Sequence, residues 1–198
     1  YSLNNTSGLR MESYTEANTS AIAAETYYNS REELFFDEVY ANGRRYAGGN
    51  ITLSSYDRGE GWAASPVQNN ENIDISVTLP EAARSVTLPT LIFNLVGANN
   101  NQHNASVFVG PDENNLRLLG SFIFNGFDFR VVPINIQWTD VDTDGSLFVR
   151  ITPTAPNDRL TISTLEVQYP REFVSDGVSD QVINLRENND GKSFIRVT

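Results

Sequence analysis

Three aspartates at alternate positions precede Gly145, and this spacing suggests a metal site. Asp140, Asp142 and Asp144 stand before the glycine as the first oxygen ligands of a calcium-binding loop do. The twelfth position of such a loop carries a bidentate glutamate, and here it holds Ile151. An Asp-Gly pair is also typical of a tight turn between two strands. The turn is the interpretation that we favour, and a lone, weak calcium site stays open.

The chain has a single histidine and no cysteine, which limits the catalytic chemistry that it could perform. His103 lies in an asparagine-rich stretch with no second ligand or nucleophile nearby, so we expect a solvated loop histidine. Neither a catalytic triad nor a multi-histidine metal site can be assembled convincingly. Adjacent acids, Glu32 with Glu33 or Asp37 with Glu38, have the residue types of a glycosidase pair, but such neighbours are usually only solvated. We predict no catalytic residue, and no cofactor other than calcium.

Planar aromatic side chains are the other candidates for binding, because they can stack on sugar rings across the face of a β-sandwich. Trp62 lies in a glycine-rich turn, where burial is not expected, and it is the strongest candidate. Tyr56 and Tyr46 are the weaker members of the same predicted ligand site. Trp138 follows two isoleucines at the period of a strand, which favours a place in the core instead.

The composition predicts a folded, exported protein that binds no nucleic acid and does not insert into membranes. The 198 residues are 39% hydrophobic and 11% aromatic, enough for one large core. A formal net charge of -11 would repel polyphosphate backbones. No apolar run approaches the roughly 20 residues of a membrane helix. A chain rich in Asn, Thr and Ser with one lysine is typical of exported bacterial β-domains, so we expect it in the periplasm, at the cell surface or secreted.

Short β-prone runs separated by turn residues predict an all-β fold, an antiparallel β-sandwich that is jelly-roll-like. In the clearest run Ile73, Ile75, Val77 and Leu79 alternate with polar residues, so one face is buried and the other is wet. Further strands are expected at residues 91–96, 106–110, 116–124, 129–136, 146–151 and 160–169. The asparagine-rich stretch 99–104 is expected to be an exposed loop, because a core could not satisfy its amides. No window carries a sustained helical period.

The spacing divides the chain into three segments. Residues 1–31 are a polar lead-in, residues 32–170 are the β-sandwich, and residues 171–198 are a linking hairpin or the start of a further domain. The hairpin is predicted from the Asp-Gly pair at residues 190–191. A strand that ends near Thr198 would leave an edge that needs a neighbour, so we expect a downstream domain of the same parent chain as a partner.

Several stretches read together are similar to a known protein family. Residues 33–36 lead toward a Gly-Glu-Gly-Trp turn at residues 59–62, and residues 105–120 carry a strand and a hairpin. The stretch 160–171 ends in a Tyr-Pro-Arg exit, and residues 194–197 supply a linking strand. This pattern resembles the β-sandwich region upstream of the peptidase domain in gingipain-like (caspase-fold) cysteine peptidases, including the type IX secretion system signal peptidase.

The resemblance implies a noncatalytic module that supports a cysteine peptidase domain beyond Thr198, with the catalytic His and Cys in that domain. The chain departs from the family pattern at Ser163 and Thr164, where the family tends to carry an apolar residue and an aspartate. The alternative is a carbohydrate-binding or adhesin-type β-sandwich on the bacterial cell surface, which would use Trp62, Tyr56 and calcium. Its partner would be a glycan or a cell-surface protein.

Overall fold

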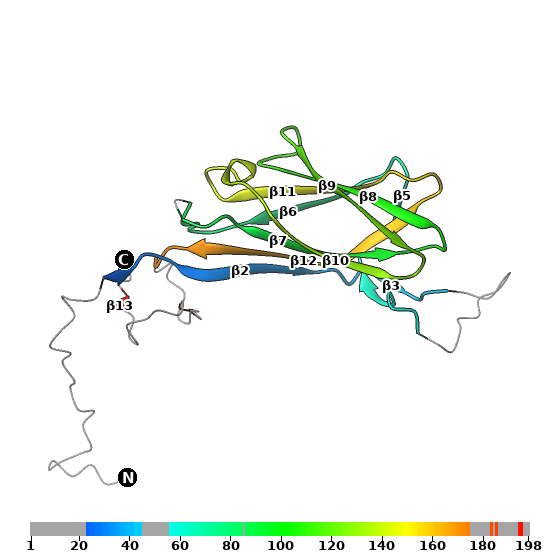
Figure 1. Ribbon diagram of the computed structural model, residues 1–198, viewed down its shortest axis with the longest axis horizontal. Helices are drawn as coiled ribbons and strands as arrows, with labels where there is room; N and C mark the ends of the chain where they lie inside the picture. The colour runs from blue at the N-terminus through cyan, green and yellow to red at the C-terminus, as the bar shows by residue number, and fades with distance from the viewer. Residues whose placement is uncertain are drawn as a thin grey trace, which may run out of the picture.

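Two β-sheets pack face to face in this chain, as the computed structural model shows (Figure 1). The structure describes residues 23–44, 56–84, 86–174, 183, 185 and 194–195. Neighbouring strands within each of the two large sheets are antiparallel. The prediction of an all-β, antiparallel β-sandwich is therefore confirmed.

The first sheet has five strands and is centred on the longest strand of the fold. Its strand order is β10 (Phe129–Asn135), β7 (Thr90–Gly97), β12 (Arg159–Arg171) and β2 (Tyr28–Phe35), with β5 (Val67–Gln68) paired to the start of β12. The second sheet has four strands in the order β6 (Ile73–Thr78), β11 (Ser146–Pro153), β8 (Gln102–Gly110) and β9 (Arg117–Asn125). The strands predicted between residues 73 and 169 all occur, with ends shifted by a few residues.

Alternating apolar residues from the two sheets meet between them and form the core. In β6 the pattern is the predicted one, because Ile73, Ile75 and Val77 are buried while the residues between them are exposed. Leu79 follows and is 1% exposed. Each such side chain stabilises the fold by roughly 1.5–3 kcal/mol when fully buried, so the period-two pattern decides which face of each strand turns inward. Fully buried members from other strands include Leu91, Phe93, Leu95, Val107, Val109, Val149, Ile151, Leu160, Ile162, Leu165 and Val167.

The asparagine-rich stretch corrects one expectation. Residues 99–101 form a turn, but β8 already begins at Gln102, and His103 is 0% exposed rather than solvated. The prediction of a loop histidine was therefore wrong. Its premise was that the polar side chains would find no partners in a core. A partner exists for His103, Asp158, but it lies 55 residues further along the chain.

The second correction concerns the residues after β10. A single strand through residue 136 was expected, with Trp138 on the same apolar face. β10 ends at Asn135, and a short 3-10 helix, η2 (Trp138–Asp140), follows. Trp138 still packs against the core while partly exposed, and its indole nitrogen donates to the Thr87 carbonyl at 3.1 Å. The strand period could not foresee η2, because its turn is capped by the Asp140 side chain.

Two small ribbons flank the sandwich. β3 (Val39–Ala41) pairs antiparallel with β4 (Gly61–Ala63), and β1 (Ala24–Glu25) pairs parallel with β13 (Phe194–Ile195). The hairpin predicted at residues 190–191 lies outside the described residues. In the described part of the C-terminal segment, Phe194 and Ile195 pair with β1.

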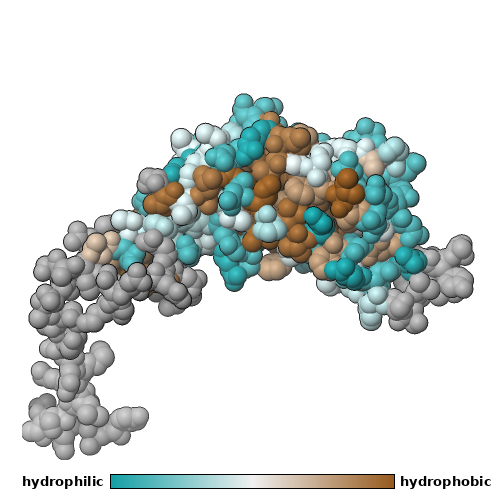
Figure 2. All heavy atoms as spheres, in the orientation of Figure 1, coloured by the Kyte–Doolittle hydropathy of each residue, from teal (hydrophilic) through white to brown (hydrophobic). Residues whose placement is uncertain are grey.

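One side of the sandwich, where the edge strands β9 and β10 lie (Figure 1), carries apolar surface. Figure 2 shows apolar side chains gathered in the middle of the face in view, ringed by hydrophilic ones. Exposed apolar residues of the sheet-edge strands β9 and β10 are Leu118, Ile123 and Val131. Within the described ranges, no helix is long and apolar enough to cross a lipid bilayer.

Candidate functional site

The β3–β4 ribbon presents two aromatic rings to solvent. Tyr40 and Trp62 are directly opposite each other across the ribbon, with ring centroids 5.7 Å apart and ring planes at 87°. Trp62 is 59% exposed and Tyr40 is 46% exposed. Edge-to-face contact is a preferred geometry for aromatic pairs, so each ring holds the other in place. The pair therefore combines fixed orientation with open surface.

Hydrogen bonds outside the ribbon fix both of its ends. The backbone N–H of Ser65, just after β4, donates to Glu38 Oε2 at 2.9 Å, just before β3. This hydrogen bond is the largest cause that lowers the pKa of Glu38 below its ordinary 4.5. At the other end the Arg44 N–H donates to Asp57 Oδ2 at 2.6 Å. Gly43 has a φ of 64° there, and a Cβ would meet the Asp57 and Glu60 side chains, so this position requires glycine.

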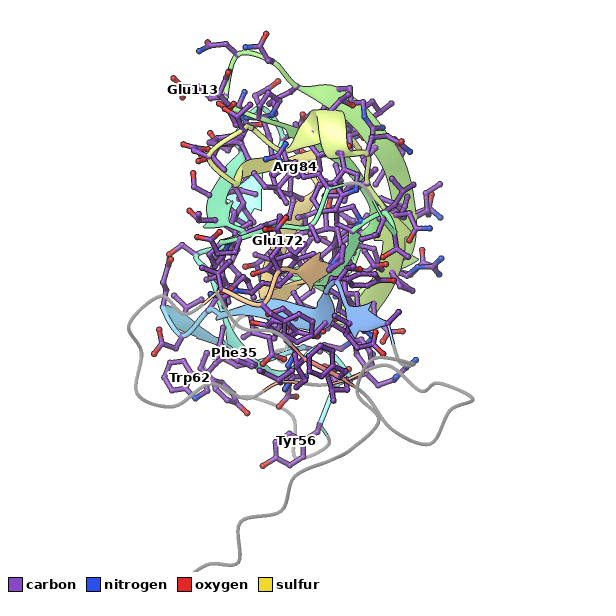
Figure 3. The ribbon with its side chains drawn as sticks, turned by 90° about the vertical axis from the view of Figure 1, so that its left-hand side faces the viewer. Phe35, Tyr56, Trp62, Arg84, Glu113 and Glu172 are labelled. Carbon is purple, nitrogen blue, oxygen red and sulfur yellow. The ribbon has the colours of Figure 1, made fainter. Side chains whose placement is uncertain are left out.

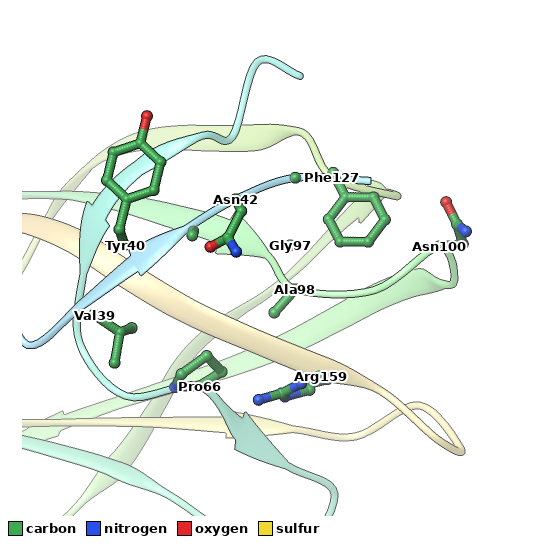
Figure 4. A pocket seen from close by; sticks show the side chains of 11 residues that line it. Val39, Tyr40, Asn42, Pro66, Gly97, Ala98, Asn100, Phe127 and Arg159 are labelled. Carbon is green, nitrogen blue, oxygen red and sulfur yellow. The ribbon is translucent and has the colours of Figure 1, made fainter. Parts of the chain in front are cut away.

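An open cavity of about 520 Å³ lies beside the ribbon at one end of the sandwich (Figure 4). Figure 4 shows Tyr40 and Arg159 on opposite sides of it. The cavity is within the roughly 300–1,000 Å³ range of small-ligand pockets. The lining residues come from β3 and the segment after it, from the β4–β5 connection, from the end of β7 and the turns before β8 and β10, and from the start of β12: Val39, Tyr40, Ala41, Asn42, Gly43, Pro66, Gly97, Ala98, Asn100, Phe127 and Arg159.

A buried histidine–aspartate pair lies directly behind the cavity wall. His103 Nδ1 is 2.5 Å from Asp158 Oδ1, and both side chains are 0% exposed. His103 Nε2 is 2.8 Å from the Gly126 carbonyl oxygen, and the Asn104 N–H donates to Asp158 Oδ2 at 2.9 Å. Both ring nitrogens thus lie within hydrogen-bond distance of oxygen atoms. At Gly97 a Cβ would collide with the Gly126 carbonyl and the His103 ring, so the strands approach closely here.

The hydrogen bonds of His103 set the position of two cavity residues. Arg159 follows Asp158 in the chain, and Phe127 follows Gly126. Since His103 contacts both Asp158 and the Gly126 carbonyl, it connects the turn before β12 to the turn before β10. His103 is therefore a positioning residue for the cavity, and with its ring buried it cannot meet an external substrate.

The polar side chains of the cavity differ in how far they are already engaged. Asn99 and Asn101 each donate to the Asn157 carbonyl at 2.8 Å, which shapes the turn before β8. The Asn100 amide between them is exposed and makes no hydrogen bond to the described part of the chain. Arg159 is also exposed, and its guanidinium has no ion pair or hydrogen bond among the described residues. Both groups can therefore bind a ligand without giving up an internal contact.

The sequence-based aromatic site is partly assembled. Trp62 is exposed as expected, although it lies on β4 rather than in a turn. Tyr56 is 84% exposed, and Figure 3 shows its ring projecting away from the sandwich on the same side as Trp62 and Phe35. Phe35 is 72% exposed and was not predicted. Tyr46 lies outside the described residues.

Two exposed aromatic residues that sequence reasoning missed had a usable signal. Phe35, the last residue of β2, stands next to another phenylalanine, and neighbouring side chains of an extended chain point to opposite sides. Tyr40 alternates with Val39 and Ala41, which are turned the other way. Arg159 had no such signal, because its place beside β3 arises only when distant turns meet.

The aspartates of segment 140–145 accept hydrogen bonds from other residues of the chain. Asp140 is 3% exposed and accepts two hydrogen bonds from Arg117, at 2.6 Å from Nε and 2.5 Å from Nη2. These bonds are the main cause that raises the pKa of Arg117. Asp142 Oδ1 accepts the Thr143 N–H, and Asp144 Oδ1 accepts the Ser146 N–H.

The same segment closes the connection into β11, since the Asp142 N–H donates to Ser146 and the Gly145 N–H donates to Asp142. The structure thus shows the turn that we favoured. In the part of the chain that is described, no three His, Cys, Asp or Glu side chains are grouped to hold a metal. Calcium binding by Asp140, Asp142 and Asp144 stays a prediction, and the pairing of Asp140 with Arg117 weighs against it.

The adjacent acids of β2 do not form a catalytic pair. Glu32 is the acceptor of the Tyr169 hydroxyl at 3.2 Å, whereas Glu33 is exposed and lies 3.4 Å from Arg31. As neighbours in a strand, their side chains point to opposite faces of the sheet. No shared substrate could lie between them.

No protein-family model matches this chain, and no curated protein matches it. Among solved structures, it is similar to the CBM36-1 domain of a multidomain xylanase from the hindgut metagenome of Trinervitermes trinervoides, with 15% identity, a TM-score of 0.42, and coverage of 70% of this chain and 96% of that one. It is also similar to the xylan-binding module CBM15, with 16% identity, a TM-score of 0.41, and coverage of 73% and 99%. The coat protein of Tobacco streak virus matches with 8% identity, a TM-score of 0.33, and coverage of 78% and 95%.

Likenesses with such low identities and TM-scores carry no functional argument, and they join sugar-binding modules with a virus coat protein. None of them bears on the resemblance to gingipain-like peptidases, which stays a prediction. The function of the chain must be inferred from its own residues.

Proposed function

We propose that this chain is a noncatalytic, carbohydrate-binding β-sandwich of an exported protein. The observation that carries the proposal is the exposed Tyr40–Trp62 pair, of which Tyr40 also lines an open cavity. It corresponds to the alternative that the sequence left open, and Trp62 is the residue on which that alternative was based.

The chemistry of the ribbon fits a sugar ring. One face of many pyranose rings carries only C–H groups, which pack on the flat face of an aromatic side chain, while the hydroxyls at the ring edge need hydrogen-bond partners. Trp62 offers a flat surface, and its indole N–H makes no hydrogen bond within the described residues. The exposed Asn100 amide at the cavity rim supplies a donor and an acceptor for hydroxyls.

A purely structural role explains the pair less well. Single exposed apolar residues are common on protein surfaces and need no explanation. Here two rings face each other, their strands are held at both ends, and a cavity opens next to them. Since Trp62 is 59% exposed, its surface contributes little to the core, whereas binding would desolvate it.

The test uses the two tryptophans of the chain. Trp138→Phe leaves Trp62 as the sole tryptophan, and its fluorescence is titrated with soluble xylan, mannan, galactan, β-glucan and pectin. Affinity gel electrophoresis of the unmodified protein with the same glycans gives a second readout that does not depend on the variant. We expect at least one glycan to bind and to shift the Trp62 emission to the blue.

Trp62→Ala should then reduce the affinity at least about tenfold, because a central aromatic anchor is removed. Its urea midpoint should stay near that of the unmodified protein, since the ring is mostly exposed. The matched control is Leu118→Ala, which removes a 53% exposed apolar side chain from β9 and should leave glycan affinity unchanged. No retardation by any glycan, or retardation that persists in Trp62→Ala, would refute the proposal.

A further inference from the structure

We infer that the cavity beside the ribbon selects glycans that carry an anionic substituent, and that the Arg159 guanidinium binds this oxyanion. The inference rests on the proposed function and adds the class of glycan to it. Its basis is the charge of the cavity, which differs from that of the rest of the chain.

Arg159 is the only charged side chain among the described residues that line the cavity. The whole chain carries 25 acidic and 14 basic residues, so a cavity with one arginine and no carboxylate departs from its surroundings. Guanidinium groups bind carboxylate and sulfate oxygens through two parallel N–H donors, which adds direction to the charge attraction. The cavity is therefore locally cationic on an acidic protein.

Three arginines elsewhere in the sandwich are paired with carboxylates, whereas the exposed Arg130 of β10, like Arg159, has no such partner in the described chain but does not line the cavity. Arg58 is 3.3 Å from Asp128, and Arg150 makes a two-pronged contact of 2.7 Å with Asp74. Arg117 is held in the same way by Asp140. By contrast, the described part of the chain offers the Arg159 guanidinium no carboxylate. An external anion would supply the partner that these arginines find internally.

Several contacts fix the backbone that precedes Arg159. Two residues earlier Asn157 has a φ of 56°, a left-handed conformation that asparagine adopts more readily than most residues. Its carbonyl accepts the amides of Asn99 and Asn101, and Asp158 is bonded to His103. These contacts fix the turn before Arg159 on the same wall as Asn100, whose amide can bind a neighbouring hydroxyl.

The negative net charge of the protein helps to distinguish a local anion site from general electrostatic attraction. A chain with a formal charge of -11 repels polyanions at long range, and salt weakens that repulsion. A preference for acidic glycans could therefore not arise from general electrostatic attraction. It would have to come from a local contact such as the one with Arg159.

The experiment compares polysaccharides that differ only in charge. Affinity electrophoresis of the unmodified protein is run with polygalacturonate against its methyl ester, and with dextran sulfate against dextran. Arg159→Gln removes the cavity charge. The matched control is Arg130→Gln, which removes an exposed arginine of β10 that does not line the cavity.

We expect about tenfold tighter binding of one charged member than of its neutral counterpart, the size of one charge-assisted hydrogen-bonded contact. The preference should vanish in Arg159→Gln and persist in Arg130→Gln. Preference for polygalacturonate identifies a carboxylate as the bound group, and preference for dextran sulfate identifies a sulfate ester.

Two outcomes overturn the inference, and they are distinguishable. Trp62-dependent binding that is equal for charged and neutral glycans, or a charge preference that survives Arg159→Gln, refutes the anion site and leaves the proposed function standing. Absence of binding to these four polymers and to the five glycans of the first panel refutes both.

Discussion

The two ends of the sandwich treat their charged and polar groups in opposite ways. At the end where β8 begins and β12 starts, the cavity has an arginine and an asparagine amide without partners in the described chain, beside two exposed rings. At the end where β9 and β11 begin, the acids Asp140, Asp142 and Asp144 all accept hydrogen bonds from nearby residues. Figure 1 places β3 and the connection into β11 at opposite ends of the molecule.

The difference distinguishes charged side chains that stabilise the fold from those that remain able to bind a ligand. The aspartates have the residue types and spacing that drew attention in the sequence, yet their hydrogen bonds are used to close a turn. Arg159 and Asn100 belong to no sequence motif, yet their side chains line the cavity without a partner in the described chain. Whether a polar side chain already has a hydrogen-bond partner is visible only in the fold. It therefore indicates a binding residue better than the residue type does.

The largest expected effect concerns the buried pair behind the cavity. His103→Ala should lower the free energy of unfolding by about 3–5 kcal/mol, because it removes the side chain that pairs with the fully buried Asp158 and leaves a cavity in its place. Urea denaturation followed by fluorescence measures the loss. Phe124→Leu, which changes the ring packed against His103 but keeps the pair, should cost less. A loss below about 1 kcal/mol for His103→Ala would show that the pair does not hold the cavity end together.

At the opposite end the expected loss is smaller. Asp140→Asn should cost about 1–2 kcal/mol, since it weakens the paired hydrogen bonds to Arg117, whose side chain is 44% exposed and therefore screened by solvent. Asp142→Asn in the same turn is the control and should change the urea midpoint little. Glycan affinity should be unaffected by both variants. A loss of binding in either one would mean that this end takes part in the site.

Acid should loosen the ribbon slightly. The lowered pKa of Glu38 means that its ionised form stabilises the fold at pH values above 4.5, and that this contribution disappears as the pH falls through the lowered folded value. The effect is small because the carboxylate is exposed. The Ser65 amide resonance, followed by NMR from pH 6 to pH 3, should report the change in the unmodified protein and show no such step in Glu38→Gln. An identical step in the variant would assign the change to another group.

Chelation should have the smallest effect. Because Asp140 is already paired with Arg117, dialysis against EDTA should leave the thermal midpoint unchanged, and added calcium should not raise it. A calcium-dependent rise that disappears in Asp142→Asn would instead support the calcium site suggested by the spacing of the aspartates.

Much of the fold was predictable because its signals are local. Period-two alternation located β6 and its buried face, and turn residues bounded the other large strands. The errors came from contacts between distant residues. His103 is buried because Asp158 reaches it, and Trp138 leaves the strand period because Asp140 closes a 3-10 turn.

The candidate site was predictable only in part for the same reason. Trp62 was identified because glycines around it argued against burial, and the structure confirms its exposure. The cavity was not foreseen, since its walls come from β3, the β4–β5 connection, the end of β7, the turns before β8 and β10, and the start of β12. That Arg159 has no carboxylate partner can be recognised only once the fold shows which residues lie near it.

The most direct test of the glycan-binding account is an NMR titration of the labelled protein with an oligosaccharide of the tightest-binding glycan. The account predicts perturbed signals for the Trp62 indole N–H, the Tyr40 and Asn100 amides and the Arg159 side chain, with the amides of residues 140–145 unmoved. Perturbation centred on residues 140–145, or no perturbation at the β3–β4 ribbon, would contradict it.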